Sequence, residues 1–144
     1  MKQQNYQSSI TTNMNAEGVY NNIARVNEWW AKNFEGSALN LGDSFFVKFG
    51  TTWVNFEITA AQPNEKIVWK VIDCYLPWLK DKTEWNNTEV IWEMENHNGV
   101  TTVQMTHQGL SPVVECFETC QKGWNEYISG SLFKLLNEGV GMPG

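Results

Sequence analysis

The spacing of apolar residues changes near Pro112, and this change limits the folds that the chain can adopt. Between Phe45 and His107, apolar and polar residues alternate in short segments, as they do on strands that bury one face. From about Pro112, the apolar residues instead recur every three or four positions, as on one side of a helix. Closely spaced strands with one apolar face form antiparallel sheets. We therefore expect a meander of strands followed by one long helix.

The alternating segments are separated by residues that break strands. They are Phe45–Phe49, Val54–Ile58, Ile67–Val71, Val90–Met94 and Val103–His107. Gly50 follows the first and Pro63 follows the second, while Asn98-Gly99 is typical of a hairpin turn between the last two. A weaker alternation over Tyr6–Ile10 predicts an additional edge strand.

Three helices are expected around these strands. Asn15 is a suitable N-cap for a first helix, and a second short helix holds Val26 to Trp30 and ends near Asn33. The long C-terminal helix has Ser111 as its N-cap and ends at Gly139. About 25 residues at 1.5 Å each give roughly 37 Å, enough to cross a whole sheet. The 144 residues fit one α+β domain.

Charge and hydropathy exclude several classes of partner. The net charge is −6 and the ten basic residues are scattered, which argues against nucleic acid and anionic membranes as partners. No apolar stretch approaches the roughly 18 residues of a membrane span. Because Met1–Tyr6 shows no apolar run, we expect no signal peptide and a cytoplasmic location.

The three cysteines are expected to be reduced thiols, because their number is odd and no export signal is visible. Cys116 and Cys120 lie one helical turn apart on the same face. A metal site needs three or four ligands, and no zinc spacing occurs. We expect two buried thiols in the helix, and neither a metal nor a cofactor.

Several segments together resemble a known family. They are Thr83-Glu84-Trp85-Asn86-Asn87-Thr88-Glu89-Val90, Thr106-His107-Gln108-Gly109-Leu110, Glu115-Cys116, Cys120, Gly123-Trp124, Tyr127-Ile128, Ser131-Leu132 and Gly139-Val140-Gly141-Met142-Pro143. The chain resembles the proteins related to the C-terminal domain of the Hsp90 ATPase activator, a branch of the START-like, Bet v 1-like superfamily (SRPBCC). This resemblance implies a single domain over residues 1–144 with the helix-grip fold: a curved antiparallel sheet around a long C-terminal α-helix, with two short helices after the first strand. It also implies a cavity between sheet and helix, but no catalytic set.

The aromatic residues are the main candidates for function. Eight Trp, seven Phe and four Tyr form an unusually large set. We expect a hydrophobic ligand to contact residues on the inward face of the strands and on the long helix. These candidates are Trp30, Phe45, Phe56, Trp69, Trp92, Met105, His107, Trp124, Tyr127 and Ile128. Phe49 has the same inward phase. For each ring, ordinary core packing is the alternative.

His107 and two further groups of rings leave alternatives open. His107 could orient a ligand or transfer a proton, although a structural role is the more common fate of such a residue. Trp29 and Trp30 point about 100° apart on a helix, so at most one is expected to face the core. The rings of Tyr75, Trp78 and Trp85 are expected to form a lid or an interface.

The preferred functional hypothesis is non-enzymatic binding of a small hydrophobic or aromatic molecule. No nucleophile elbow, phosphate loop or zinc-protease motif occurs, so no catalytic residue is assigned. One alternative is an Hsp90 cofactor or stress-response interaction module, with a homodimer as a further partner. Another is a cyclase- or hydrolase-like enzyme that uses His107.

Overall fold

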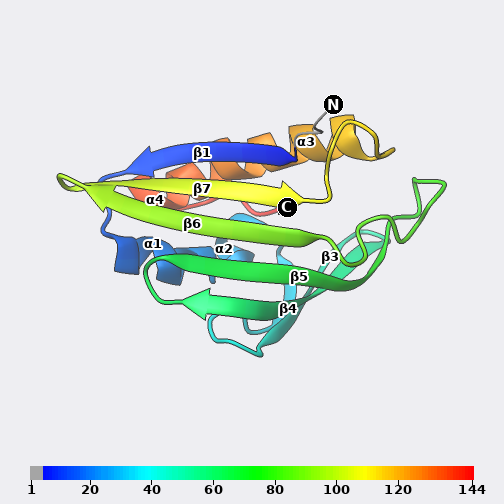
Figure 1. Ribbon diagram of the computed structural model, residues 1–144, viewed down its shortest axis with the longest axis horizontal. Helices are drawn as coiled ribbons and strands as arrows, with labels where there is room; N and C mark the ends of the chain where they lie inside the picture. The colour runs from blue at the N-terminus through cyan, green and yellow to red at the C-terminus, as the bar shows by residue number, and fades with distance from the viewer. Residues whose placement is uncertain (1–4) are drawn as a thin grey trace.

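The computed structural model describes residues 5–144, in which seven strands form one curved antiparallel sheet (Figure 1). The strands are β1 (Tyr6–Thr12), β2 (Asn33–Gly36), β3 (Ser44–Phe49), β4 (Thr52–Gln62), β5 (Lys66–Tyr75), β6 (Glu89–His97) and β7 (Val100–Gln108). Their order across the sheet is β1-β7-β6-β5-β4-β3-β2, and every neighbouring pair is antiparallel. The predicted meander and its edge strand at Tyr6–Ile10 are confirmed, whereas β2 was not predicted.

The helices lie together on one face of the sheet (Figure 1). They are α1 (Ala16–Ile23), α2 (Val26–Trp29), α3 (Phe117–Asn125), η1 (Glu126–Leu132) and α4 (Phe133–Glu138). The last three are continuous and form the long C-terminal helix. Asn15 caps α1 as predicted, since its side chain accepts the N–H of Gly18 at 2.8 Å. These features confirm the predicted α+β helix-grip fold.

The C-terminal helix differs from its prediction at its start and in its middle. Residues 111–116 form tight turns, in which Val114 N–H donates to Ser111 and Phe117 N–H donates to Val114, so the helix begins at Phe117 and not at Pro112. Its central segment η1 is a π-helix, whose wider turns allow the N–H of Phe133 to reach the carbonyl of Ile128. π-Helical segments are rare in proteins, and those that occur often lie at functional sites.

Both tryptophans of the Trp29-Trp30 pair are buried, so the prediction that at most one faces the core is wrong. The α2 helix is a single turn, and Trp30 follows its end with a φ of −114°. Trp29 packs toward the sheet against Trp69 and Trp92, and Trp30 packs against Trp124 of the C-terminal helix. The two rings also stack on each other at a centroid distance of 6.1 Å and share Trp69 as a neighbour, so both belong to one buried aromatic cluster.

The pairing of β5 changes along its length and opens the sheet at one end. Lys66 to Lys70 pair with β6, but beyond this point β5 pairs only with β4. Residues 76–88 then leave the sheet as a long connection, here named the 76–88 loop. This loop and the start of α3 lie at the same end of the sheet, on the right of Figure 1.

Candidate functional site: an aromatic pocket at the open end of the sheet

A pocket of about 380 Å³ lies between the C-terminal helix and the open end of the sheet. Four parts of the chain line it. The C-terminal helix contributes Thr119, Cys120, Gly123, Trp124 and Tyr127, and the strands β3 and β4 contribute Phe49, Thr52 and Val54. The 76–88 loop contributes Leu76, Trp78 and Trp85, and Trp30 comes from the end of α2. These residues define the aromatic pocket. None of its lining residues, all within the described part of the chain, is charged.

Three stacked indoles form the inner wall of the aromatic pocket. The ring of Trp124 lies 4.9 Å from that of Trp30 and 6.1 Å from that of Trp85, with interplanar angles of 29° and 8°. The three rings come from α3, from the end of α2 and from the 76–88 loop. The pocket therefore exists only in the assembled fold, and it offers flat apolar surfaces to a ligand.

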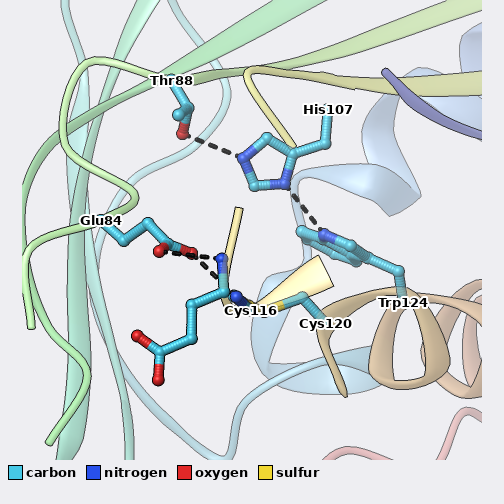
Figure 2. Close-up of a disulfide and its surroundings, with 7 residues drawn as sticks. Glu84, Thr88, His107, Cys116, Cys120 and Trp124 are labelled. Atoms are coloured by element: carbon cyan, nitrogen blue, oxygen red, sulfur yellow. Dashed lines mark hydrogen bonds between the residues drawn. A yellow bond between two sulfur atoms is a disulfide. The ribbon is translucent and has the colours of Figure 1, made fainter. Parts of the chain in front are cut away.

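The 76–88 loop is held in place by a carboxylate. The side chain of Glu84 accepts the backbone N–H of Cys116 at 2.9 Å and that of Glu115 at 3.2 Å (Figure 2). In return, the side chain of Glu115 accepts the backbone N–H of Lys80 at 2.9 Å. Glu84 thus satisfies two donors in the turn that precedes α3, where negative charge is favourable. As a result, the loop that carries Trp78 and Trp85 is fastened to the helix opposite.

His107 lies behind the indoles and has no exposed surface. Thr88 donates its hydroxyl hydrogen to the carbonyl of Trp85, so Nε2 of His107 donates to Thr88 Oγ at 2.9 Å. Nδ1 then accepts the indole N–H of Trp124 at 3.1 Å (Figure 2). Burial lowers the pKa of His107 to about 3. The imidazole is therefore a neutral Nε2–H tautomer at pH 7, with both nitrogens bonded to protein groups.

The predicted ligand contacts divide between the pocket and the core behind it. Trp30, Trp124 and Tyr127 line the aromatic pocket, together with Trp78 and Trp85 of the predicted lid. Trp78 is 48% exposed at the surface, whereas Trp85 is 8% exposed and lies inside. The other candidates are buried residues that do not line the pocket: Phe45, Phe56, Trp69, Trp92, Met105, His107 and Ile128.

The buried rings fill the space between sheet and helices. Trp69 is within 6.4 Å, centroid to centroid, of Trp29, Trp30, Phe45, Phe56 and Trp92. The inner part of the aromatic interior is thus close-packed, and the pocket lies at its end. Tyr75 points elsewhere and packs against Trp53.

Sequence reasoning missed part of the pocket wall. Phe49 and Val54 had the inward phase of alternating strands and Cys120 was expected to be buried in the helix, but none of the three was assigned to a ligand site. Gly123 entered only through the family resemblance, and Thr52, Leu76 and Thr119 carried no signal of their own. The role of Glu84 was also missed, because it depends on a loop returning to a helix start 31 residues later.

Cys116 and Cys120 are joined by a disulfide, with Cα atoms 5.6 Å apart, and Cys74 is free and buried (Figure 2). The prediction of three reduced thiols is therefore wrong for this pair. That prediction rested on the expected compartment and on the odd number of cysteines. It left out that two thiols one helical turn apart lie close enough to form a bond. Among residues 5–144, no cluster of three or more His, Cys, Asp or Glu could hold a metal ion.

The fold and pocket define a helix-grip domain, and comparisons with known proteins agree. The sequence model of the activator of Hsp90 ATPase homolog 1-like proteins matches residues 15–137. The chain belongs to this family. No curated protein matches it significantly. Over the described residues, no helix is both long and apolar enough to span a bilayer.

Solved structures show the same fold at low sequence identity. The Aha1 dimer of Colwellia psychrerythraea is 20% identical with a TM-score of 0.76, and the match covers 98% of this chain and 100% of that one. The protein SSP2350 of Staphylococcus saprophyticus is 15% identical with a TM-score of 0.70, over 94% and 93% of the two chains. DynU16, from the dynemicin biosynthetic locus, is 15% identical with a TM-score of 0.68, over 94% of this chain and 48% of that one.

Proposed function

We propose that the protein binds a small, uncharged, aromatic or largely apolar molecule in the aromatic pocket. The observation that carries this proposal is a pocket of about 380 Å³ walled by the stacked indoles of Trp30, Trp124 and Trp85, with no charged lining residue. Its volume falls in the range of about 300–1,000 Å³ found for small-molecule sites. Thr52, Thr119 and Tyr127 supply hydroxyl groups that would orient the ligand.

The same site supports binding without catalysis. An acid or base must reach the proton that it transfers. His107 is neutral, fully buried and bonded to Thr88 and Trp124, so it would need to break a bond to act on a ligand. The His107 enzyme hypothesis is accordingly less well supported than the binding hypothesis.

Matched ligands of equal shape test the proposal. We expect 2-acetylnaphthalene to bind with saturable changes in tryptophan fluorescence, and 2-naphthoate to bind far more weakly. The two have nearly the same shape, but burying an unpaired carboxylate in an apolar site is costly. Equal binding of both compounds, or no response to a wider panel of aromatics and lipids, would count against the proposal.

A second candidate function is self-association through the outer face of the sheet. Phe46, Trp53 and Tyr75 form a strip of rings there, with centroid distances of 6.0 and 6.4 Å along it. Tyr75 is 38% exposed, and the Colwellia relative is a dimer. A homodimer through this strip would bury these rings. Sedimentation equilibrium tests this candidate: Trp53→Glu should shift the protein to monomer, and a monomeric wild-type protein would contradict it.

The family description also leaves a chaperone cofactor as an alternative, with the exposed rings of Tyr75 and Trp78 as contacts. The ATPase rate of the Hsp90 from the same organism, measured with and without the protein, tests this role. An unchanged rate and no capture of Hsp90 would exclude it.

A further inference from the structure

The disulfide partners occupy different positions relative to the aromatic pocket. Cys120 lies on the helical wall of the pocket, whereas Cys116 has no exposed surface. A reagent small enough to enter the pocket would therefore meet Cys120 first. The separation of 5.6 Å between the two Cα atoms is within the usual range for disulfides, about 4.4–6.8 Å.

Cys116 is also part of the contact that holds the 76–88 loop. Its backbone N–H donates to Glu84 Oε1, next to the side chain that forms the disulfide (Figure 2). Trp85 follows Glu84 directly and stacks on Trp124. A bond between Cys116 and Cys120 therefore joins the anchor of the loop to the helical wall of the pocket.

We propose that Cys120 and Cys116 are a reversible redox site that is reached through the aromatic pocket. The thiolate of Cys120 attacks a hydroperoxide, whose O–O bond breaks to give a sulfenic acid and, after protonation, water or an alcohol. The thiol of Cys116 then attacks this sulfur, forming the S–S bond and releasing water. Two molecules of a low-molecular-weight thiol reduce the bond again and become a disulfide themselves.

The chain supplies both parts that such a site requires: an accessible thiol and a neighbouring resolving thiol. Cys74 lacks both parts, because it is buried and has no disulfide partner. It therefore serves as an internal control for general oxidation of buried thiols.

A ligand in the aromatic pocket would cover Cys120 and slow its oxidation. This coupling rests on the proposed function, whereas the redox site itself does not. Gly123 offers a way to separate them, because a Cβ at this position would meet no atom within 4 Å. A leucine there would fill the space beside Cys120 without any ligand being present.

The test begins with fully reduced protein that is treated with hydrogen peroxide, unfolded in acid with N-ethylmaleimide and mapped by mass spectrometry. We expect a peptide pair joined through Cys116 and Cys120, lighter by two hydrogens, with Cys74 alkylated. Dithiothreitol should restore all three thiols. The proposal would be overturned if N-ethylmaleimide modified both Cys116 and Cys120 after the peroxide treatment, since no disulfide would then have formed. A disulfide that involves Cys74 would also overturn it.

Variants assign the two roles. In Cys116→Ala, Cys120 should give a sulfenic acid that dimedone traps, while in Cys120→Ala the remaining Cys116 should yield no dimedone adduct. Circular dichroism identifies a variant that fails to fold. If a cysteine variant does not fold, Gly123→Leu is used in its place. Disulfide formation in Gly123→Leu should be slower than in the wild-type protein. An unchanged rate would show that oxidants do not reach Cys120 through the pocket.

The coupling is measured separately, by repeating the oxidation with 2-acetylnaphthalene present. Slower disulfide formation is the expected result. If the disulfide forms at the same rate and the compound does not bind, the proposed function fails while the redox site stands. If the compound binds but the rate is unchanged, ligand and oxidant do not share the pocket, and the proposed route is wrong.

Discussion

The indole N–H of Trp124 donates a 3.1 Å hydrogen bond to Nδ1 of His107, and the imidazole is fully buried. This bond joins the C-terminal helix to β7 behind the aromatic pocket. It orients the ring that stands between Trp30 and Trp85. His107 therefore positions a wall of the pocket, although it does not line the pocket itself.

Replacing His107 with Leu should lower the free energy of unfolding by about 1–3 kcal/mol, because the buried N–H of Trp124 would lose its acceptor. Chemical denaturation measures this change. The control His97→Leu alters an exposed residue at the end of β6 and should change stability by less than about 0.5 kcal/mol. Equal effects of the two substitutions would contradict the structural role of His107.

The low pKa of His107 predicts a loss of stability in mild acid. Burial lowers this pKa from its ordinary value of 6.5 to about 3 in the folded protein, so below pH 6.5 the unfolded chain binds a proton that the folded chain does not. Linkage gives a loss of about 2 kcal/mol between pH 7 and pH 5, relative to a variant without the imidazole. Unfolding curves of wild type and His107→Leu at both pH values test this. Parallel pH dependences would show that His107 is not buried and neutral.

Glu84 should hold the 76–88 loop against the turn that precedes α3. Glu84→Ala removes the acceptor of the Glu115 and Cys116 N–H groups, and the loss of such a helix-start acceptor costs about 0.5–2 kcal/mol. We expect faster hydrogen exchange at these two amides and in the loop. Glu93→Ala, on the exposed face of β6, is the matched control. Unchanged exchange at Glu115 and Cys116 would contradict the anchoring role.

Ser131 should fasten the chain that follows the C-terminal helix. Its hydroxyl donates to the carbonyl of Trp29 at 2.5 Å and accepts the N–H of Met142 at 2.6 Å. Ser131→Ala leaves both groups without this partner, so we expect a loss of about 1–3 kcal/mol and faster proteolysis after Gly139. Ser9→Ala, an exposed position on β1, should change neither. Proteolysis at the wild-type rate would rule out this role.

The strands could be predicted because each one obeys a local rule. Alternation marked β3 to β7, and Asn98 and Gly99 adopt the positive φ angles, 53° and 84°, that their turn requires. The start of the C-terminal helix could not be predicted in this way. Helical spacing already begins at Pro112, but Glu84 from a distant loop bonds to the turn before Phe117.

The pocket was only partly predictable for a related reason. Alternation on the strands and helical spacing on the C-terminal helix identify which rings face inward, and Trp124 was found from the helical spacing. These patterns do not say which inward rings pack against each other, as Trp69 and Trp92 do, and which leave space beside them. That depends on the path of the 76–88 loop and on Gly123, whose missing side chain leaves part of the wall open.

Substitution of Gly123 tests the proposed binding site most directly. Gly123→Leu should fill the aromatic pocket, since a Cβ there meets no atom within 4 Å and the helix accepts leucine readily. Gly130→Leu is the matched control, because Gly130 is equally open but does not line the pocket. In calorimetric titrations with 2-acetylnaphthalene, we predict that Gly123→Leu abolishes binding and that Gly130→Leu binds like wild type. Binding to Gly123→Leu at wild-type affinity would contradict the assignment of the pocket as the ligand site.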